Sequence, residues 1–220
     1  MGCKMDKTKK ISIAVIRRLP RYYRYLSDLL RDGIERISSK ELSEKMRITA
    51  SQIRQDLNNF GGFGQQGYGY NVVSLNAEIG KILGIDNCYK AIIIGAGNMG
   101  HALANYPNFA GRGYEIVGIF DISKELIGTF ARKSEQRNLE IMDLSTITEF
   151  VSKNKVDIAM ITVPSQYTKE VAELAVSLGI KALWNFSPMD LRLPGDVVIE
   201  NVHLSDSLMV LGYRLNKLNN

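Results

Sequence analysis

The sequence predicts an α/β fold in which an N-terminal winged helix-turn-helix domain is followed by a doubly wound parallel sheet of the Rossmann type. Three observations support this fold: a turn with three spaced glycines near the middle of the chain, apolar runs that alternate with helical stretches after it, and two short capped helices before it. The 220 residues, 45% of them hydrophobic and 23% charged, suffice for two small domains.

Composition argues against several classes of protein. No apolar run approaches the roughly 18 residues needed to cross a membrane, and no charged-then-apolar leader begins the chain. We therefore expect a cytoplasmic protein without a membrane partner. Two cysteines and two histidines are too few for a disulfide framework or a zinc site, so no metal is expected.

The positive charge is concentrated in the first part of the chain. Residues 1–80 contain 14 lysines and arginines against 8 acidic residues, a net charge of +6, whereas residues 81–220 contain 14 against 15, a net charge of −1. This asymmetry is typical of a polyanion-binding module joined to a neutral ligand-binding domain. A solvated basic surface would give the same totals and stays open as the alternative.

A helical stretch opens this basic part. Apolar residues recur at helical spacing over residues 11–31, with arginines between them. Pro20 either begins a new helix segment or kinks this one, and Gly33 marks its end. Tyrosines at this spacing more often pack in a core than contact phosphates, so we expect Tyr22, Leu26 and Leu29 to be buried.

Two short capped helices follow and predict a helix-turn-helix. Residues 38–41 and 49–52 both have the capping-box pattern, in which the two end residues satisfy each other's free N–H groups. The second helix would bury Ile53 and Leu57. Its outward side chains are of the types that pair with base edges or phosphates: Ser51, Gln52, Arg54, Gln55 and Asn58. A solvent-exposed polar face is the alternative for the helix pair taken alone.

Residues 60–72 alternate aromatic residues with glycines, which predicts a small hairpin with a tight turn near Gln66 and Gly67. A helix-turn-helix followed directly by such a hairpin is a winged helix, and its wing tip usually contacts the phosphate backbone or the minor groove. A glycine-rich loop is the alternative for this stretch alone.

Residues 90–100 form an apolar run that ends in Gly95, Gly97 and Gly100, with the spacing G-x-G-x-x-G. A strand, a tight turn and a helix start would leave free N–H groups that can bind a pyrophosphate. A second apolar run ends in Asp121, 21 positions after the last glycine, where a dinucleotide site has its ribose-binding acid. A carboxylate repels a 2′-phosphate, which favours NAD(H) over NADP(H). An ordinary structural turn is the alternative.

The second half of the chain should form one parallel, doubly wound sheet, because helical stretches separate its apolar runs. One of these helices should start near Gln166 with Ser165 as its N-cap. Ligands of such sheets lie at the carboxyl ends of the strands. Six strands are expected, at residues 90–94, 115–120, 139–143, 156–162, 181–186 and 197–202. We expect domains at residues 1–84 and 85–203, followed by a C-terminal helix within residues 204–220.

With both halves placed, the chain resembles the Rex family of bacterial redox-sensing transcriptional repressors over essentially its whole length. The segments that carry the resemblance are residues 18–26, 51–57, 60–64, 67–71 and 95–100, with Tyr106 and Pro107. The resemblance implies a homodimeric repressor, and not an enzyme, with a C-terminal helix exchanged between subunits. It also implies that the dimer binds a palindromic, A·T-rich double-stranded operator when the NADH/NAD⁺ ratio is low and releases it when NADH binds.

Site residues follow from the matched positions and from the patterns above. The NAD(H)-binding residues are expected to be Gly95, Ala96, Gly97, Asn98, Met99, Gly100, Tyr106, Asp121, Thr162, Val163 and Pro164. The DNA-binding residues are expected to be Arg18, Ser51, Gln52, Arg54, Gln55, Asn58, Gln66 and Gly67.

The chain departs from the family pattern in three places. Gln55 stands where many members have a basic residue, and the wing tip carries glutamines, which should shift DNA binding from counterion release toward direct readout. His203 and Leu204 stand where Asp-Phe is usual, so the family's ionic link from position 203 to Arg24 of the partner subunit is not assured. A histidine there would make the switch sensitive to pH.

Two other functions fit part of the sequence. An NAD-dependent oxidoreductase with an N-terminal helical extension would need a catalytic side chain and a substrate domain after the sheet, yet 18 residues follow the sixth strand. A nucleotide-binding adaptor would use its basic half for a protein partner. Binding of an A·T-rich duplex, and its release by NADH, separates the repressor from both.

Overall fold

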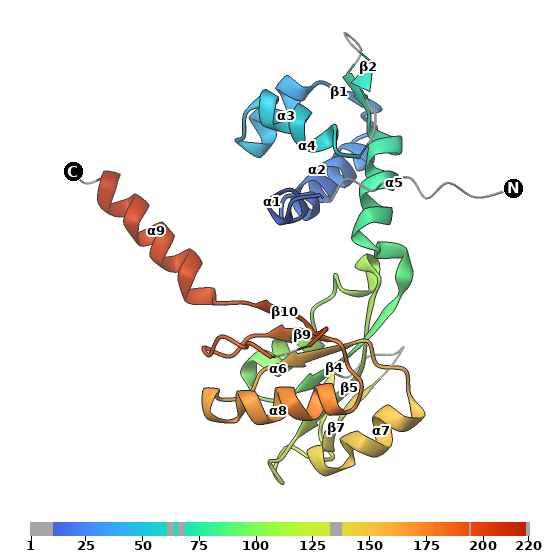
Figure 1. The fold of residues 1–220 in the computed structure, drawn as a ribbon, viewed down its shortest axis with the longest axis vertical. Coiled ribbons are helices and arrows are strands. Elements are labelled where there is room, and N and C mark those ends of the chain that lie inside the picture. Colours follow the sequence, from blue (N-terminus) through green and yellow to red (C-terminus); the bar gives the residue numbers. More distant parts are fainter. Residues whose placement is uncertain (1–10, 61–63, 66–68, 133–137, 194, 219–220) are drawn as a thin grey trace, which may run out of the picture. The chain divides into compact units, whose positions relative to one another are not determined.

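The computed structural model describes residues 11–60, 64–65, 69–132, 138–193 and 195–218. The chain divides into two compact units, residues 1–86 and 87–220, and each is described by itself. Figure 1 shows the helices and short strands of the first unit and the sheet and helices of the second.

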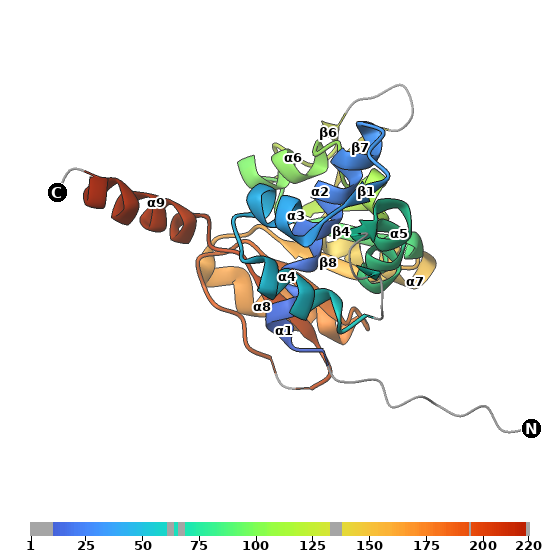
Figure 2. The ribbon, with the colours of Figure 1, turned by 90° about the horizontal axis from the view of Figure 1, so that it is seen from above.

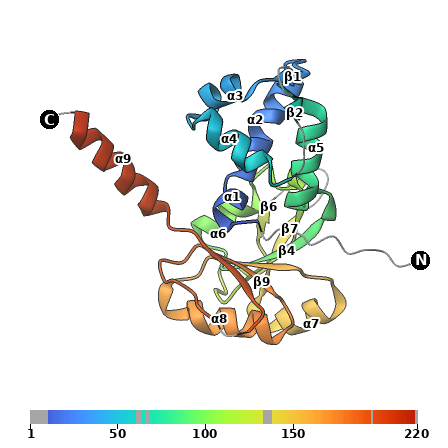
Figure 3. The ribbon, with the colours of Figure 1, turned by 45° about the horizontal axis from the view of Figure 1, so that its top comes forward.

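The first unit contains five helices and three short strands among its described residues. In chain order they are α1 (Ile13–Ile16), α2 (Leu19–Arg31), β1 (Arg36–Ile37), α3 (Ser39–Met46), α4 (Ala50–Leu57), β2 (Gly64–Gln65), β3 (Gly69–Asn71) and α5 (Val72–Leu83). The strands form an antiparallel sheet in the order β1-β3-β2, and Figure 3 shows the helices gathered around α2. This arrangement confirms the predicted winged helix-turn-helix.

Helix α2 supplies much of the core of this unit. Pro20 lies in its first turn, where a missing N–H costs nothing, so this proline begins a new helix rather than kinking a longer one. Tyr22, Leu26 and Leu29 are buried as predicted. The helix ends at Gly33, which has a φ of 72°.

The two predicted capping boxes have different outcomes. At α3, the Ser38 hydroxyl accepts from the Glu41 N–H and the Glu41 carboxylate accepts from the Ser38 N–H, which is the full box. At α4, Thr49 accepts from the Gln52 N–H at 3.1 Å, but the Gln52 side chain donates to Asp56 instead of returning to the cap. The second box is therefore only half formed.

The wing is an antiparallel hairpin, as predicted, with Gly64 opposite Tyr70 and Gln65 opposite Gly69. Gly69 has a φ of 71°, and a Cβ on it would lie 2.7 Å from the Ile37 carbonyl oxygen, so only glycine fits there. The predicted wing-tip residues Gln66 and Gly67 lie outside the described residues.

A buried charge joins α2 to α4. The carboxylate of Asp56 is fully buried and accepts hydrogen bonds from the guanidinium of Arg18 at 2.6 and 2.7 Å. The Tyr22 hydroxyl and the Gln52 amide donate to the same carboxylate at 3.0 and 2.8 Å. Burial raises the pKa of Asp56, but the hydrogen bonds from Arg18, Gln52 and Tyr22 outweigh it, and the net pKa is lowered. This ionised cluster was not predicted.

The second unit is a mixed, mostly parallel sheet. Among the described residues it has seven strands in the order β10-β9-β8-β4-β5-β7-β6. Their bounds are β4 (Tyr89–Ile94), β5 (Tyr114–Asp121), β6 (Phe130–Arg132), β7 (Leu139–Asp143), β8 (Ile158–Ile161), β9 (Ala182–Asn185) and β10 (Val198–Asn201). All pairs are parallel except β6 with β7. The six predicted strands are present, and the antiparallel edge strand β6 was missed.

Helices cover both faces of this sheet. They are α6 (Asn98–Ala104), α7 (Ile147–Lys153) and α8 (Ser165–Ser177), with short 3₁₀ turns at η1 (Ile85–Asn87), η2 (Ala110–Arg112) and η3 (Leu144–Thr146). Successive residues of β4 point to opposite faces: Ile92 packs in the cluster with α7 and α8, and Ile93 in the cluster with α6. Helix α8 begins one residue earlier than predicted, with Pro164 as its N-cap residue, so the prediction of Ser165 as N-cap is wrong.

Helix α9 (Leu204–Leu218) ends the described chain. None of its residues is buried, and in Figures 1 and 2 it extends away from the sheet of its own unit. Several large apolar side chains on this helix are therefore exposed to solvent in the single chain.

We predict that Arg18→Ala lowers the free energy of unfolding of the first unit by about 3 kcal/mol, because it leaves the buried carboxylate of Asp56 without its counterion. Urea unfolding followed by far-ultraviolet circular dichroism and amide hydrogen exchange would measure the loss. The control is Arg31→Ala, which breaks an exposed ion pair with Asp28 and should cost less than about 1 kcal/mol. Equal losses in the two variants would contradict the role given to Asp56.

Candidate functional site

Two of the three glycines in the turn after β4 are required sterically, and the third faces open space. Gly95 has a φ of 105°, and a Cβ on it would lie 2.7 Å from the Thr162 carbonyl oxygen. A Cβ on Gly100 would lie 2.0 Å from the Gly95 carbonyl oxygen. Because glycine has no Cβ, α6 can begin directly against the strand end. A Cβ on Gly97 would meet nothing within 4 Å, so this glycine keeps open the space in front of the turn.

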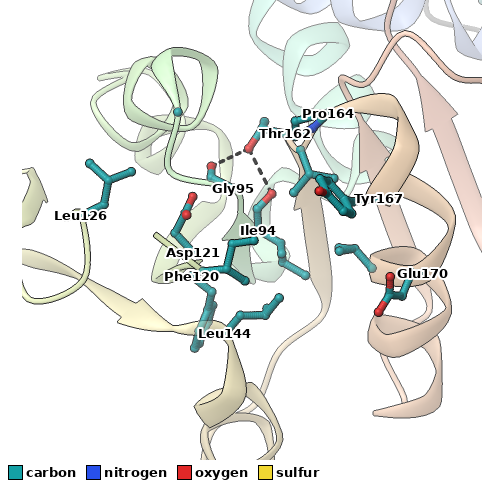
Figure 4. Close-up of a pocket in the computed structure, with 14 residues that line it drawn as sticks. Ile94, Gly95, Phe120, Asp121, Leu126, Leu144, Thr162, Pro164, Tyr167 and Glu170 are labelled. Carbon is teal, nitrogen blue, oxygen red and sulfur yellow. Dashed lines mark hydrogen bonds between the residues drawn. The ribbon is translucent and has the colours of Figure 1, made fainter. Parts of the chain in front are cut away.

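Thr162, at the end of β8, locks this turn in place. Its hydroxyl donates to the carbonyl oxygen of Gly95 at 2.7 Å and also lies 3.1 Å from that of Ile94, as Figure 4 shows. Strands β4 and β8 are neighbours whose connections run to opposite sides of the sheet, so the turn and Thr162 lie at its topological switch point. The predicted residues Gly95 and Thr162 are thus brought together.

Asp121, the last residue of β5, faces the same turn. One carboxylate oxygen accepts from the Ala96 N–H at 2.6 Å, and the other accepts from the Ser123 N–H at 2.8 Å. Each carboxylate oxygen can accept more than one hydrogen bond, so Asp121 can still bind ligand hydroxyls. The two backbone bonds fix the direction in which the side chain points.

A pocket of about 600 Å³ opens at these strand ends. Six of the predicted cofactor residues line it: Gly95, Gly97, Asp121, Thr162, Val163 and Pro164. Eight further residues complete the lining: Ile94, Phe120, Ile122, Leu126, Leu144, Tyr167, Glu170 and Val171. The second group was not predicted. Ile94 and Phe120 directly precede the predicted residues Gly95 and Asp121 in their strands, whereas the other six reach the pocket through the packing of α8 and of the segments after β5 and β7.

The other predicted cofactor residues do not line this pocket. Ala96 is buried behind Asp121, and Asn98, Met99 and Gly100 form the first turn of α6. Tyr106 is 50% exposed and lies against Phe109, with ring centroids 4.8 Å apart. Phe109 in turn contacts Trp184 of β9 at 5.8 Å, so Tyr106 begins an aromatic cluster on the α6 face of the sheet.

The candidate nucleic-acid interface is the outer face of α4. Ser51, Arg54, Gln55 and Asn58 are exposed, while Ile53 and Leu57 are buried as predicted. Arg54 donates to the Ser39 hydroxyl at 3.0 Å, which draws its guanidinium toward the start of α3. At the end of α3, Arg47 adopts a left-handed conformation with a φ of 51°, and the chain turns there into α4.

Two other predicted DNA-binding side chains bind the buried carboxylate of Asp56. Gln52 is only partly exposed, and its amide donates to Asp56. Arg18 places two of its nitrogens on the same carboxylate. Arg18 therefore helps to hold α4 against α2, whereas Gln52 supports the same carboxylate from within α4. Asp56, which binds both side chains, was not predicted.

A polar network anchors the segment before α9. The buried Asn185 amide donates to the Met189 carbonyl oxygen at 2.7 Å and to Asn201 at 2.8 Å. The adjacent Asp190 carboxylate lies 2.8 Å from Nε2 of His203. This hydrogen bond raises the pKa of His203. The unusual histidine thus has an acidic partner within its own chain.

The described residues contain neither a membrane-spanning helix nor a metal site. No described helix is both long and apolar enough to cross a membrane. No group of three or more histidine, cysteine or acidic residues in the described part of the chain is arranged to hold a metal ion.

Comparison with known proteins agrees with the two-part architecture. A family model for a DNA-binding protein N-terminus matches residues 10–58, and one for a CoA binding domain matches residues 86–189. The redox-sensing transcriptional repressor Rex of Thermoanaerobacter pseudethanolicus is 56% identical over 213 residues, covering 97% of this chain and 93% of that protein. The protein of the same name from Clostridium botulinum is 54% identical, covering 97% and 99%.

Solved structures also match nearly the whole length of this chain. The crystal structure of RSP in complex with β-NAD⁺ and operator DNA has a TM-score of 0.86 and 55% identity, covering 96% of this chain and 95% of that one. RSP in complex with β-NADH has a TM-score of 0.86 and 52% identity, covering 96% and 97%.

We predict that two alanine substitutions in the glycine turn have different effects on stability. Gly97→Ala should leave the Tm within about 2 °C of the parent, because its Cβ meets no neighbour and its φ of −69° suits any residue. Gly100→Ala should lower the free energy of unfolding by about 3 kcal/mol, since it forces the strand and helix apart. Thermal unfolding followed by the fluorescence of the single tryptophan, Trp184, reports on this unit. Similar Tm values for the two variants would refute this geometry.

Proposed function

Because this chain belongs to the Rex family of redox-sensing transcriptional repressors, we propose that it binds operator DNA through its winged helix and leaves the operator when NADH occupies the pocket. The observation that supports this most directly is the coexistence, in one chain, of an exposed polar recognition helix and a pocket bounded by a glycine turn and an acid. The nucleotide is then a signal that is read, not a reagent that is consumed.

The pocket has the chemistry that NAD(H) requires. The open space in front of Gly97 admits a pyrophosphate to the N-terminus of α6, where free N–H groups and the helix dipole favour negative charge. Asp121 offers its carboxylate to ribose hydroxyls and repels a phosphate on that ribose. NADP(H), with a 2′-phosphate, and CoA, with a 3′-phosphate, are disfavoured for the same reason.

We assign operator contact to the exposed face of α4 and to the wing. Arg54, Gln55 and Asn58 have donors and acceptors suited to base edges in a major groove, and Ser51 lies in the first turn, near a phosphate. Gln66 and Gly67 are assigned to the wing tip. Arg18 acts through Asp56 by fixing the orientation of α4, and Gln52 supports the Asp56 carboxylate from within the same helix. Membership of the Rex family implies an A·T-rich palindromic operator, and the amide side chains of Gln55 and Asn58 are suited to pair with adenine.

We propose that the protein is a homodimer held together by α9. Leu204, Leu208, Leu211 and Leu215 recur at positions i, i+4, i+7 and i+11, and all four are exposed. An apolar stripe of this length has to be covered, and exchange of the helix with a second copy would cover it. Since a repressor has to reach the chromosome, we place the dimer in the cytoplasm.

The central prediction is that NADH releases the protein from DNA. The protein should shift an A·T-rich palindromic duplex in an electrophoretic assay at moderate salt, and NADH should reverse the shift at concentrations where NAD⁺ does not. Arg54→Ala should abolish the shift while NADH binding stays within about twofold of the parent. The control Lys153→Ala removes an exposed charge from the other unit and should bind DNA normally. No shift, or equal release by both nucleotides, would overturn the proposal.

A second prediction concerns Asp121. Asp121→Ala should weaken NADH binding about tenfold and reduce the discrimination against NADPH by at least as much, because the acid that repels the 2′-phosphate is gone. Fluorescence titration measures both affinities, and CoA added as a competitor should displace NADH only weakly from the parent protein. Gly97→Ala, which we expect to fold, should weaken both nucleotides without changing their ratio. An unchanged NADPH/NADH ratio in Asp121→Ala would rule out the ribose role.

A third prediction tests the dimer. Glutamates introduced together at Leu208 and Leu211 should give a monomer in size-exclusion chromatography with light scattering, because two charges would have to be buried in the interface. Asn216→Glu adds a charge to the same helix outside the stripe and should remain dimeric. A dimer that survives both glutamates would mean that another surface joins the subunits.

A further inference from the structure

The pocket contains an acid that the dinucleotide motif does not require. Glu170 of α8 lines the pocket one helical turn after Tyr167, and Figure 4 shows both side chains along the same wall. Its carboxylate makes no hydrogen bond or ion pair with any residue that the structure describes. The neighbouring base, Lys169, is paired with Glu173 at 3.8 Å.

The rest of the lining shows which part of a ligand Glu170 would meet. The described lining contains two acids, Asp121 and Glu170, and no basic residue. Apolar side chains make up much of the rest of the lining: Ile94, Phe120, Ile122, Leu144 and Val171. Figure 4 shows Ile94, Phe120 and Leu144 on the floor between Asp121 and Glu170. A slot of this kind suits a flat aromatic base and not a phosphate. If Asp121 binds the ribose, the base attached to that ribose enters this slot, with its edge toward Glu170.

We propose that Glu170 is the residue that selects adenine as the base of the dinucleotide, by accepting a hydrogen bond from its 6-amino group. The inference rests on the proposed function, since it takes NAD(H) as the ligand. Hypoxanthine carries an oxo group in place of this amine, so two acceptors would face each other. Its N1–H could reach the carboxylate only if the base slid along the slot, away from the ribose position that Asp121 sets.

The expected size of the base preference follows from the solvent exposure of Glu170. Glu170 is exposed at the pocket mouth, where water competes for its carboxylate, so the preference should be far smaller than the 10⁴-fold or more of a buried polar site. We expect about a tenfold preference for the amino base, at the lower end for a hydrogen bond to a charged group.

The experiment compares NADH with its reduced hypoxanthine analogue, in which the 6-amino group is replaced by oxygen and the fluorescent nicotinamide is unchanged. Fluorescence titration of the full chain gives a Kd for each, and the readout is the ratio of the two. The parent should bind NADH about tenfold more tightly. Glu170→Gln should bring the ratio close to one, because an amide can donate to the oxo group as well as accept from the amine.

Two controls separate base selection from general damage. Glu173→Gln removes an acid one turn further along α8 that does not line the pocket, and it should keep the parent ratio. Glu170→Gln should also keep the parent melting temperature and its discrimination against NADPH, which depends on Asp121.

The outcomes are distinguishable. If the parent binds NADH but shows no base preference, or if Glu170→Gln keeps the parent ratio, the role of Glu170 is overturned while the NADH-sensing function stands. If the parent binds neither nucleotide, the proposed function fails and this inference fails with it. A parent preference that is lost in Glu170→Gln and kept in Glu173→Gln establishes the assignment.

Discussion

The close approach of the turn after β4 to the end of β8 is the constraint on which the nucleotide site depends. Gly95 lies so near the Thr162 backbone that no side chain fits, and Gly100 lies as near to Gly95. The Thr162 hydroxyl then ties the two strand ends together. Because the turn is held back in this way, the space in front of Gly97 stays open, and the carboxylate of Asp121 can reach the Ala96 N–H. The positions of the glycine turn, Thr162 and Asp121 all depend on this contact.

The first unit depends on a buried charge in a comparable way. Asp56 alone would destabilise α4, since an ionised carboxylate is costly to bury. Four hydrogen bonds from three side chains offset that cost. The bonds from Arg18 and Tyr22 come from outside α4 and are directional, so they fix how α4 is rotated against α2. The rotation decides which residues of α4 face outward. Arg18 therefore matters to DNA recognition even without touching DNA, because it keeps the recognition face in place.

Sequence patterns predicted the features that depend on residues close together in the chain. The capping box at Ser38, the strand-turn-helix at Gly95 and the core positions of α2 all depend on residues a few positions apart, and all are present. Edge strand β6 was missed because three residues are too few to show a period. The pairing of Arg18 with Asp56 spans 38 positions, and α8 brings Glu170 to the pocket through tertiary packing. Such contacts have no local sequence signal.

A repressor of this construction can respond to NADH only through a difference in affinity. The ligand must bind the arrangement of the dimer that leaves DNA more tightly than the arrangement that holds it, and operator DNA must weaken NADH binding by the same factor. A change from 99% bound to 99% free requires about a 10⁴-fold difference. Asp121 is already oriented by Ala96 and Ser123, so little of the binding energy is spent on ordering the acid. Only the part of the binding energy that differs between the two arrangements can shift the dimer, so the residues that sense NADH are those whose contacts with it change between them.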